Sequence, residues 1–273
     1  MTRPRPRPLT AAAATAALTA LTLLLSACTS PASTAPAPTN PADPLTGEVT
    51  VFAAASLQTS FDDLAAQFEQ AHPGVDVKPI VYDGSSTLAT QLVEGAQADV
   101  FAAANTSTMQ TVVDAGLAPA APTIFATNTL EIAVPKGNPA GVTQLSDLAR
   151  PGLKLVICAP DVPCGSATAK LAAAQGLSLA PVSEEQNVTA VLTKVRSGEA
   201  DAGLVYQTDI ATAKGDVEGV PAAGADAVVN SYPIAQLRAS KSEAATAFVE
   251  FVIGPQGRAT LASYGFGAPP TKP

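Results

Sequence analysis

Four short turns place small or polar residues directly before a predicted helix. They are Ala55-Ser56, Gly84-Ser85-Ser86, Pro163-Cys164-Gly165-Ser166 and Gln186-Asn187-Val188. The first backbone N–H groups of a helix have no intrahelical partner, and the helix dipole places partial positive charge there. Helix starts of this kind bind anions readily. We therefore interpret the four turns as candidate donors to one anion site.

The competing interpretation is structural. Serine is a preferred N-cap, so Ser56 or Ser85 taken alone is explained by ordinary helix capping. The number of turns favours the site, because parallel α/β sheets collect such turns at the carboxyl ends of their strands. None of the turns carries an obvious charged partner.

Residues suited to covalent or acid–base catalysis are scarce. His72 is the single histidine, and it lies in the helix-ending turn Ala-His-Pro-Gly, so a Ser–His–Asp triad would depend on it alone. The sequence contains no Walker loop and no dinucleotide fingerprint. We expect a binding protein and not an enzyme. An exported hydrolase or transferase is the less favoured alternative, and a structural role would not need convergent helix starts.

Strands and helices alternate from about residue 47 to the end of the chain. Strand-like runs cover 49–54, 75–81, 99–103, 153–157, 202–206 and 231–237, and a longer one covers 124–135. Helical patterns cover 57–70, 88–94, 108–115, 143–149, 166–175, 188–197, 243–253 and 255–263. This alternation predicts an α/β fold in which helices join mostly parallel strands.

The long segment over 124–135 divides the pattern into two α/β units, which predicts two lobes. If the chain crosses near Thr127 and returns near Val229, residues 47–127 and 229–273 form lobe I and residues 128–228 form lobe II. Each lobe would be a mixed, mostly parallel sheet flanked by helices. The cleft between the lobes is then the expected binding site.

The N-terminus predicts export. Arg3, Arg5 and Arg7 precede an apolar run that ends in Leu-Ser-Ala-Cys, which makes residues 1–27 a secretory signal peptide. A transmembrane anchor is the alternative, but the run is short. The ending resembles a bacterial lipobox, so we expect lipid on Cys28. Residues 28–46 are rich in Pro, Ala and Thr and should form a disordered tether, which places the protein at the outer face of the cell membrane.

The chain is acidic. The formal net charge is −8, and removal of a signal peptide that carries three arginines and no acids gives −8 − 3 = −11. This charge argues against nucleic acid as a partner. It does not prevent anion binding, because the long-range field is screened beyond about 8 Å at physiological salt while local N–H groups act at contact.

Two cysteines remain after Cys28. Cys158 and Cys164 lie six positions apart in Cys-Ala-Pro-Asp-Val-Pro-Cys, and outside the cytoplasm such a pair favours a disulfide. A zinc site is the alternative, but two thiols and one histidine make a poor zinc set. We predict no resident metal or cofactor.

Several motifs together resemble the periplasmic molybdate-binding proteins of ABC importers. The most specific are Val-Phe-Ala-Ala-Ala-Ser-Leu at 51–57, Gly-Ser-Ser-Thr-Leu-Ala-Thr-Gln-Leu at 84–92 and Gly-Ala-Gln-Ala-Asp-Val-Phe at 95–101. Others are Val-Pro-Cys-Gly at 162–165, Asn-Val at 187–188, Gly-Leu-Val-Tyr at 203–206, Tyr-Pro at 232–233, Gly-Pro-Gln-Gly at 254–257 and Tyr-Gly-Phe at 264–266. The resemblance covers nearly all of residues 48–267, in order.

The resemblance implies a two-lobed periplasmic-binding-protein fold that holds a tetrahedral oxyanion in the cleft. It implies hydroxyl and N–H donors from Ser56 and Ser85, backbone N–H donors from Cys164 and Val188, and the phenol of Tyr206. The family often has Ala where this chain has Cys164, and a backbone donor is indifferent to that change. Asp83 departs from a site made of donors only, and we expect its side chain to point outward.

Molybdate or tungstate is the ligand that the resemblance implies, with delivery by a monomeric protein to the membrane permease of an ABC importer. Molybdate is an unprotonated dianion at neutral pH and only accepts hydrogen bonds. Sulfate would satisfy the same donors, so a receptor for sulfate or another tetrahedral oxyanion remains the alternative.

Overall fold

The computed structural model describes residues 45–270. The predicted signal peptide, Cys28 and most of the predicted tether lie outside the described residues. Between residues 45 and 270, no helix is both long and apolar enough to cross a membrane.

The first lobe is built on a five-stranded sheet in the described part of the chain, with the order β4-β2-β5-β12-β6. These strands are β4 (Val81–Asp83), β2 (Val51–Ala54), β5 (Val100–Ala102), β12 (Asn230–Gln236) and β6 (Thr123–Asn128). The strand β12 pairs antiparallel with both neighbours, so the other strands share one direction. The prediction of a mixed, mostly parallel sheet is confirmed.

Helices cover both faces of the first sheet. On one face lie α1 (Gln58–Ala71), α7 (Glu243–Ile253) and α8 (Pro255–Ser263); on the other lie α2 (Ser85–Val93) and α3 (Thr106–Asp114). The face under α1 is packed with aromatic rings, including Phe61, Phe68 and Phe248. A short 3-10 turn, η1 (Ala55–Leu57), connects β2 to α1.

The second lobe repeats this plan. Within the described residues its sheet has five strands in the order β11-β7-β10-β8-β9. They are β11 (Val217–Val220), β7 (Leu130–Pro135), β10 (Ala202–Tyr206), β8 (Leu155–Cys158) and β9 (Ser183–Glu185). Its helices are α4 (Pro163–Ala174), α5 (Val188–Arg196), α6 (Gln207–Thr212) and the 3-10 turns η2 (Leu145–Ala149) and η3 (Ala225–Ala227). Here β7 is the strand that runs against the others.

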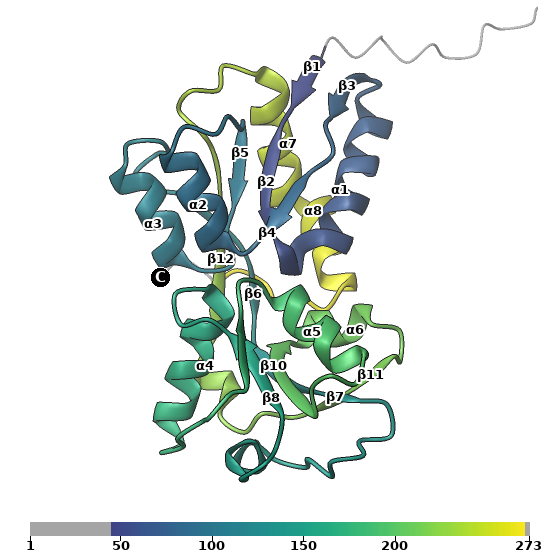
Figure 1. The fold of residues 1–273 in the computed structure, drawn as a ribbon. Coiled ribbons are helices and arrows are strands. Elements are labelled where there is room, and N and C mark those ends of the chain that lie inside the picture. The colour runs from purple at the N-terminus through teal and green to yellow at the C-terminus, as the bar shows by residue number, and fades with distance from the viewer. Residues whose placement is uncertain (1–44, 271–273) are drawn as a thin grey trace, which may run out of the picture. The chain divides into compact units, whose positions relative to one another are not determined.

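The chain passes between the two sheets at two places (Figure 1). The strand β6 ends at Asn128 and β7 begins at Leu130, so the single strand expected over 124–135 is two strands of different sheets. Both halves are rich in residues that favour strands, and periodicity alone does not show which sheet each half joins. The return lies between β11 and β12.

Other predicted element boundaries also differ from those in the structure. The run over 75–81 is two strands, β3 (Gly74–Val77) and β4, and Pro79 between them has no N–H to continue a ladder. The strand β3 pairs with β1 (Thr46–Val49), so regular structure begins at Thr46, inside the tether predicted to end there. The short elements β9, α6 and β11 were not predicted.

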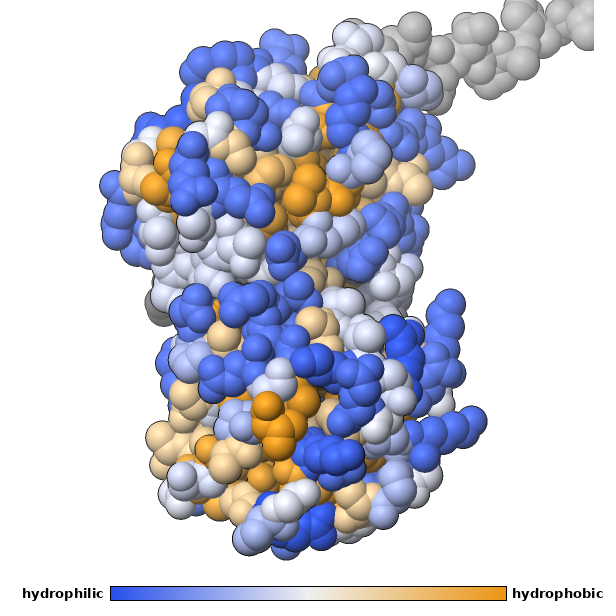
Figure 2. All heavy atoms as spheres, in the orientation of Figure 1, coloured by the Kyte–Doolittle hydropathy of each residue, from blue (hydrophilic) through white to orange (hydrophobic). Residues whose placement is uncertain are grey.

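Large apolar side chains are mostly inside. The exposed ones among the described residues are Val81, Val93, Val182 and Val229. On the face shown in Figure 2, apolar patches are separated by hydrophilic residues. This face carries scattered apolar side chains and not one broad apolar patch.

Candidate functional site: a cleft of hydrogen-bond donors

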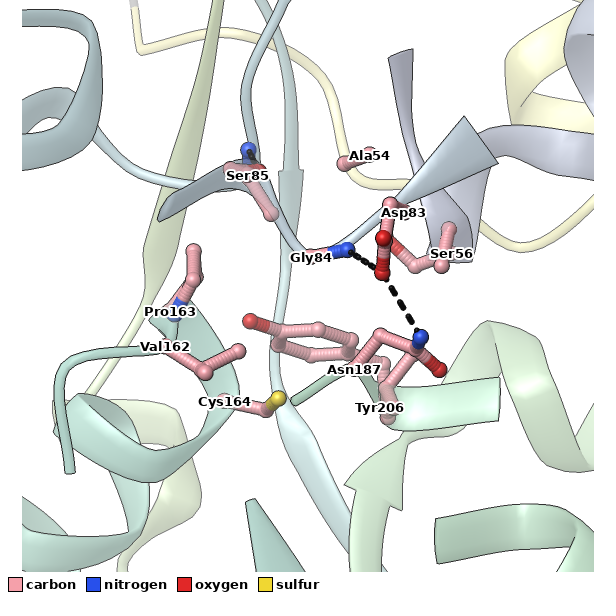
Figure 3. Close-up of a pocket in the computed structure, with 13 residues that line it drawn as sticks. Ala54, Ser56, Asp83, Gly84, Ser85, Val162, Pro163, Cys164, Asn187 and Tyr206 are labelled. Carbon is pink, nitrogen blue, oxygen red and sulfur yellow. Dashed lines mark hydrogen bonds between the residues drawn. The ribbon is translucent and has the colours of Figure 1, made fainter. Parts of the chain in front are cut away.

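The four predicted turns meet between the lobes. The turns after β2 and β4 come from the first lobe, and those after β8 and β9 come from the second. They surround a cavity of about 10 Å³, about what one water molecule needs. All five predicted donors line this cavity: Ser56, Ser85, Cys164, Val188 and Tyr206. Figure 3 shows residues of both lobes facing each other across it.

The serines of the first lobe do not cap their helices. The N-cap of α2 is Gly84, without a side-chain cap bond, and η1 also begins without one. The buried Ser85 Oγ instead accepts a hydrogen bond from the Ala104 N–H at 2.9 Å. Its own hydrogen is thereby left for donation into the cavity. Ser56 Oγ lies 3.0 Å from the Tyr232 hydroxyl.

The second lobe presents backbone donors at two helix starts. Cys164 and Val188 lie in the first turns of α4 and α5, where N–H groups have no intrahelical partner. The predicted disulfide is present: Cys158 at the end of β8 is bonded to Cys164, with Cα atoms 5.7 Å apart. The bond ties the first turn of α4 to the sheet beneath it.

Tyr206 is the last residue of β10 and is buried. Its hydroxyl oxygen accepts a hydrogen bond from Asn230 Nδ2 at 2.9 Å, and its phenolic hydrogen is within reach of the Tyr232 hydroxyl, which would compete with an anion for it. Burial, with smaller contributions from Tyr232 and Asp209, raises the pKa of Tyr206 well above its usual range. The side chain therefore stays protonated and can act as a donor at any physiological pH.

A buried polar network supports these donors and was not predicted. Asn230 Nδ2 also donates to the Ala104 carbonyl at 2.9 Å, and Asn128 Nδ2 donates to Thr208 Oγ1 at 2.8 Å. Both asparagines lie where the chain crosses between the lobes. The Tyr232-Pro233 motif was a sequence signal for part of this network. The asparagines gave no such signal, because these partners are 24 to 126 positions away.

The expectation that Asp83 points outward is wrong. Its carboxylate lines the cavity, and Oδ1 accepts hydrogen bonds from the Gly84 N–H at 2.7 Å and from Asn187 Nδ2 at 2.8 Å (Figure 3). The physical reason is the local supply of donors: the start of α2 and an amide of the second lobe both stabilise a negative charge there. The cavity lining therefore includes a carboxylate beside its donors.

Within residues 45–270, no group of three or more His, Cys, Asp and Glu side chains is placed to hold a metal ion. His72 does not line the cavity; it ends α1, with its ring centroid 4.7 Å from that of Phe68. The cavity is lined by groups of both lobes that can donate hydrogen bonds and by the Asp83 carboxylate.

A family model described as bacterial extracellular solute-binding protein matches residues 49–267. The molybdate-binding protein ModA of Mycobacterium tuberculosis is 48% identical over 233 residues, which cover 84% of this chain and 89% of the relative.

Two solved structures share the fold. The periplasmic molybdate-binding protein of Azotobacter vinelandii superposes with a TM-score of 0.69 at 21% identity, over 81% of this chain and all of that one. The sulfate-binding protein SubI of Mycobacterium tuberculosis gives 0.68 at 21% identity, over 80% and 86%. At these identities the structures establish the two-lobed fold alone. The family match and the close sequence relative establish more: this chain belongs to the bacterial extracellular solute-binding proteins.

Proposed function

We propose that this protein captures molybdate or tungstate outside the cytoplasm and delivers it to an ABC importer. One observation carries the proposal: five hydrogen-bond donors from two lobes converge on one cavity. The 48% identity to a protein named molybdate-binding gives the ligand.

The donor types fit the chemistry of the ligand. Molybdate carries two negative charges and no proton, so it needs donors on every side. Hydrogen bonds to a charged group contribute roughly 1.5–3 kcal/mol each, and several together can offset the desolvation of a dianion. The hydroxyls of Ser56, Ser85 and Tyr206 and the N–H groups of Cys164 and Val188 supply these bonds in our proposal.

Capture requires the lobes to move. A cavity of about 10 Å³ admits a tetrahedral oxyanion only after the cleft opens. We place the hinge at the two crossings, one between β6 and β7 and the other between β11 and β12. We propose that residues 47–127 with 229–273 move there against residues 128–228. An anion that contacts both lobes shifts the equilibrium toward the closed state.

The position of the protein in the cell completes the proposal. We propose that residues 1–27 direct export, that Cys28 carries lipid, and that the tether leaves a monomeric binding domain free to reach the importer. Cys28→Ala should then leave an unlipidated precursor or release the protein, and normal partition of that variant into detergent would contradict the lipid anchor.

Titration calorimetry of the chain from residue 29 onward tests the ligand. We expect 1:1 binding of molybdate and tungstate, with sulfate and phosphate much weaker. Sulfate satisfies the same donors, so cavity size must separate the two ions. Sulfate binding as tight as molybdate binding would replace our proposal with a sulfate receptor.

A further inference from the structure

The lobes are joined across the cleft by a carboxylate of the protein itself. Asp83 is the last residue of β4 in the first lobe, and Asn187 is the N-cap of α5 in the second. The 2.8 Å bond from Asn187 Nδ2 to Asp83 Oδ1 therefore spans the cleft. The same oxygen accepts the N–H of Gly84, from its own lobe.

This arrangement matches what a bound oxyanion is expected to do. One negatively charged oxygen takes a donor from each lobe and brings the two together. The Asn187 amide is fixed for this task, because its Oδ1 accepts the Ala190 N–H at 2.9 Å and so turns Nδ2 away from its helix. Hydrogen bonds of an ionised carboxylate are about twice as strong as neutral ones.

Gly84 permits the approach. A Cβ atom at this position would overlap the carbonyl oxygen of Gln186, on the opposite side of the cleft. The φ angle of Gly84 is −56°, which any residue adopts, so backbone conformation does not require glycine here. The requirement comes from the closeness of the second lobe.

We propose that Asp83 acts as a built-in anion that holds the cleft closed before an external anion binds, with Gly84 and Asn187 as its positioning residues. The inference deepens the proposed function, because the same carboxylate must repel a dianion in the cavity. Asp83 thus favours closure and lowers the affinity for the dianion at the same time.

Closure without ligand is the decisive measurement. Fluorophores on Gln110 of α3 and Lys170 of α4, both exposed, report the distance between the lobes by single-molecule energy transfer in anion-free buffer. The wild-type chain from residue 29 onward should be mostly closed. Asn187→Ser keeps an oxygen that can cap α5 but removes the amide donor, and should raise the open-to-closed ratio about tenfold or more. Gly84→Ala should also open the protein.

Asn105→Ser is the matched control. Asn105 caps α3 in the same way, accepting the Thr108 N–H at 2.9 Å, but it caps a helix of the first lobe alone. It should leave the lobe distance unchanged. Equal distance distributions for the two serine variants, or a closed Gly84→Ala protein, would overturn the inference.

Two variants of Asp83 separate closure from charge. Asp83→Asn keeps an acceptor oxygen and removes the charge, so it should stay closed more than Asp83→Ala and bind molybdate several-fold more tightly than wild type. Weaker molybdate binding by Asp83→Asn would contradict the repulsion. If wild type does not bind molybdate at all, the proposed function fails, while the anion-free distances still decide whether Asp83 closes the cleft.

Discussion

The two sides of the cleft supply donors by different means. The first lobe contributes hydroxyls, and each is held by a distant partner: Ser85 by the Ala104 N–H, and Ser56 by the Tyr232 hydroxyl. The second lobe contributes N–H groups from two helix starts, at Cys164 and Val188, and one side-chain donor, the Tyr206 hydroxyl. A side-chain donor disappears with one substitution, whereas a backbone donor survives it. Sequence constraint should therefore be strict at Ser56, Ser85 and Tyr206 and relaxed at Cys164 and Val188.

The two sides also treat negative charge differently. On the first side Asp83 keeps its carboxylate at the cavity, stabilised by donors from both lobes. On the second side Asp209 is buried next to Tyr206, and its carboxylate accepts the Tyr206 N–H at 2.8 Å. Burial raises the pKa of Asp209 to about 7, against the lowering effect of that N–H. A carboxylate next to donors is stable, and a buried one with a single donor tends to hold its proton.

The largest expected effect sharpens this contrast and concerns stability. Since the folded-state pKa of Asp209 is raised above its unfolded value, its contribution to stability is present in full below about pH 4 and is lost as the pH rises through about 7. The values 3.8 and about 7 correspond to a loss on the order of 4 kcal/mol. Asp209→Asn keeps an acceptor for the Tyr206 N–H and removes this loss.

Urea unfolding at pH 4.5 and pH 8 measures the effect. The free energy of unfolding of Asp209→Asn, relative to wild type, should rise between the two pH values. Every other titrating group is common to both proteins, so the difference isolates Asp209. Parallel pH profiles of the two proteins would show that folding does not raise the pKa of Asp209.

The next largest expected effect is on molybdate affinity, and it tests the difference between side-chain donors and backbone donors. Ser56→Ala and Ser85→Ala should each weaken molybdate binding about ten- to a hundredfold, since each removes a hydrogen bond to a dianion. Ser85→Ala should also cost about 1–3 kcal/mol of stability, because the buried Ala104 N–H loses its acceptor. Val188→Ala retains its N–H and should bind almost normally. Calorimetry on the three variants gives the answer, and equal affinities would remove the serines from the site.

The smallest effect concerns the disulfide on the second side. Replacing Cys158 and Cys164 together by Ser should cost about 2 kcal/mol of stability, as expected for a loop of this length. Molybdate affinity should change little, because the N–H at position 164 remains. Thermal unfolding with and without reductant checks the first part. A large loss of affinity at unchanged stability would mean that the bond positions the donor directly.

The sequence alone determined the local elements and the helix starts. The bounds of β10, α7 and α8 agree with the predicted ranges 202–206, 243–253 and 255–263. Apolar periodicity and turn residues are local signals, so they can be interpreted from the sequence without knowledge of the fold. The same signals placed four small-residue turns before helices, and motif resemblance named five donors that the structure brings around one cavity.

Tertiary structure decided where the chain changes sheets and what the cavity contains besides donors. A single extended pattern over 124–135 became β6 and β7 because each half pairs with a different partner, β12 or β10, far along the chain. Asn128 finds its partner Thr208 only after the first crossing, and Asn230 finds the Ala104 carbonyl only after the second. Asp83 points into the cleft because Asn187, 104 positions away, donates to it there. The direction of a side chain depends on which donors the fold brings near it, and spacing along the sequence does not contain that information.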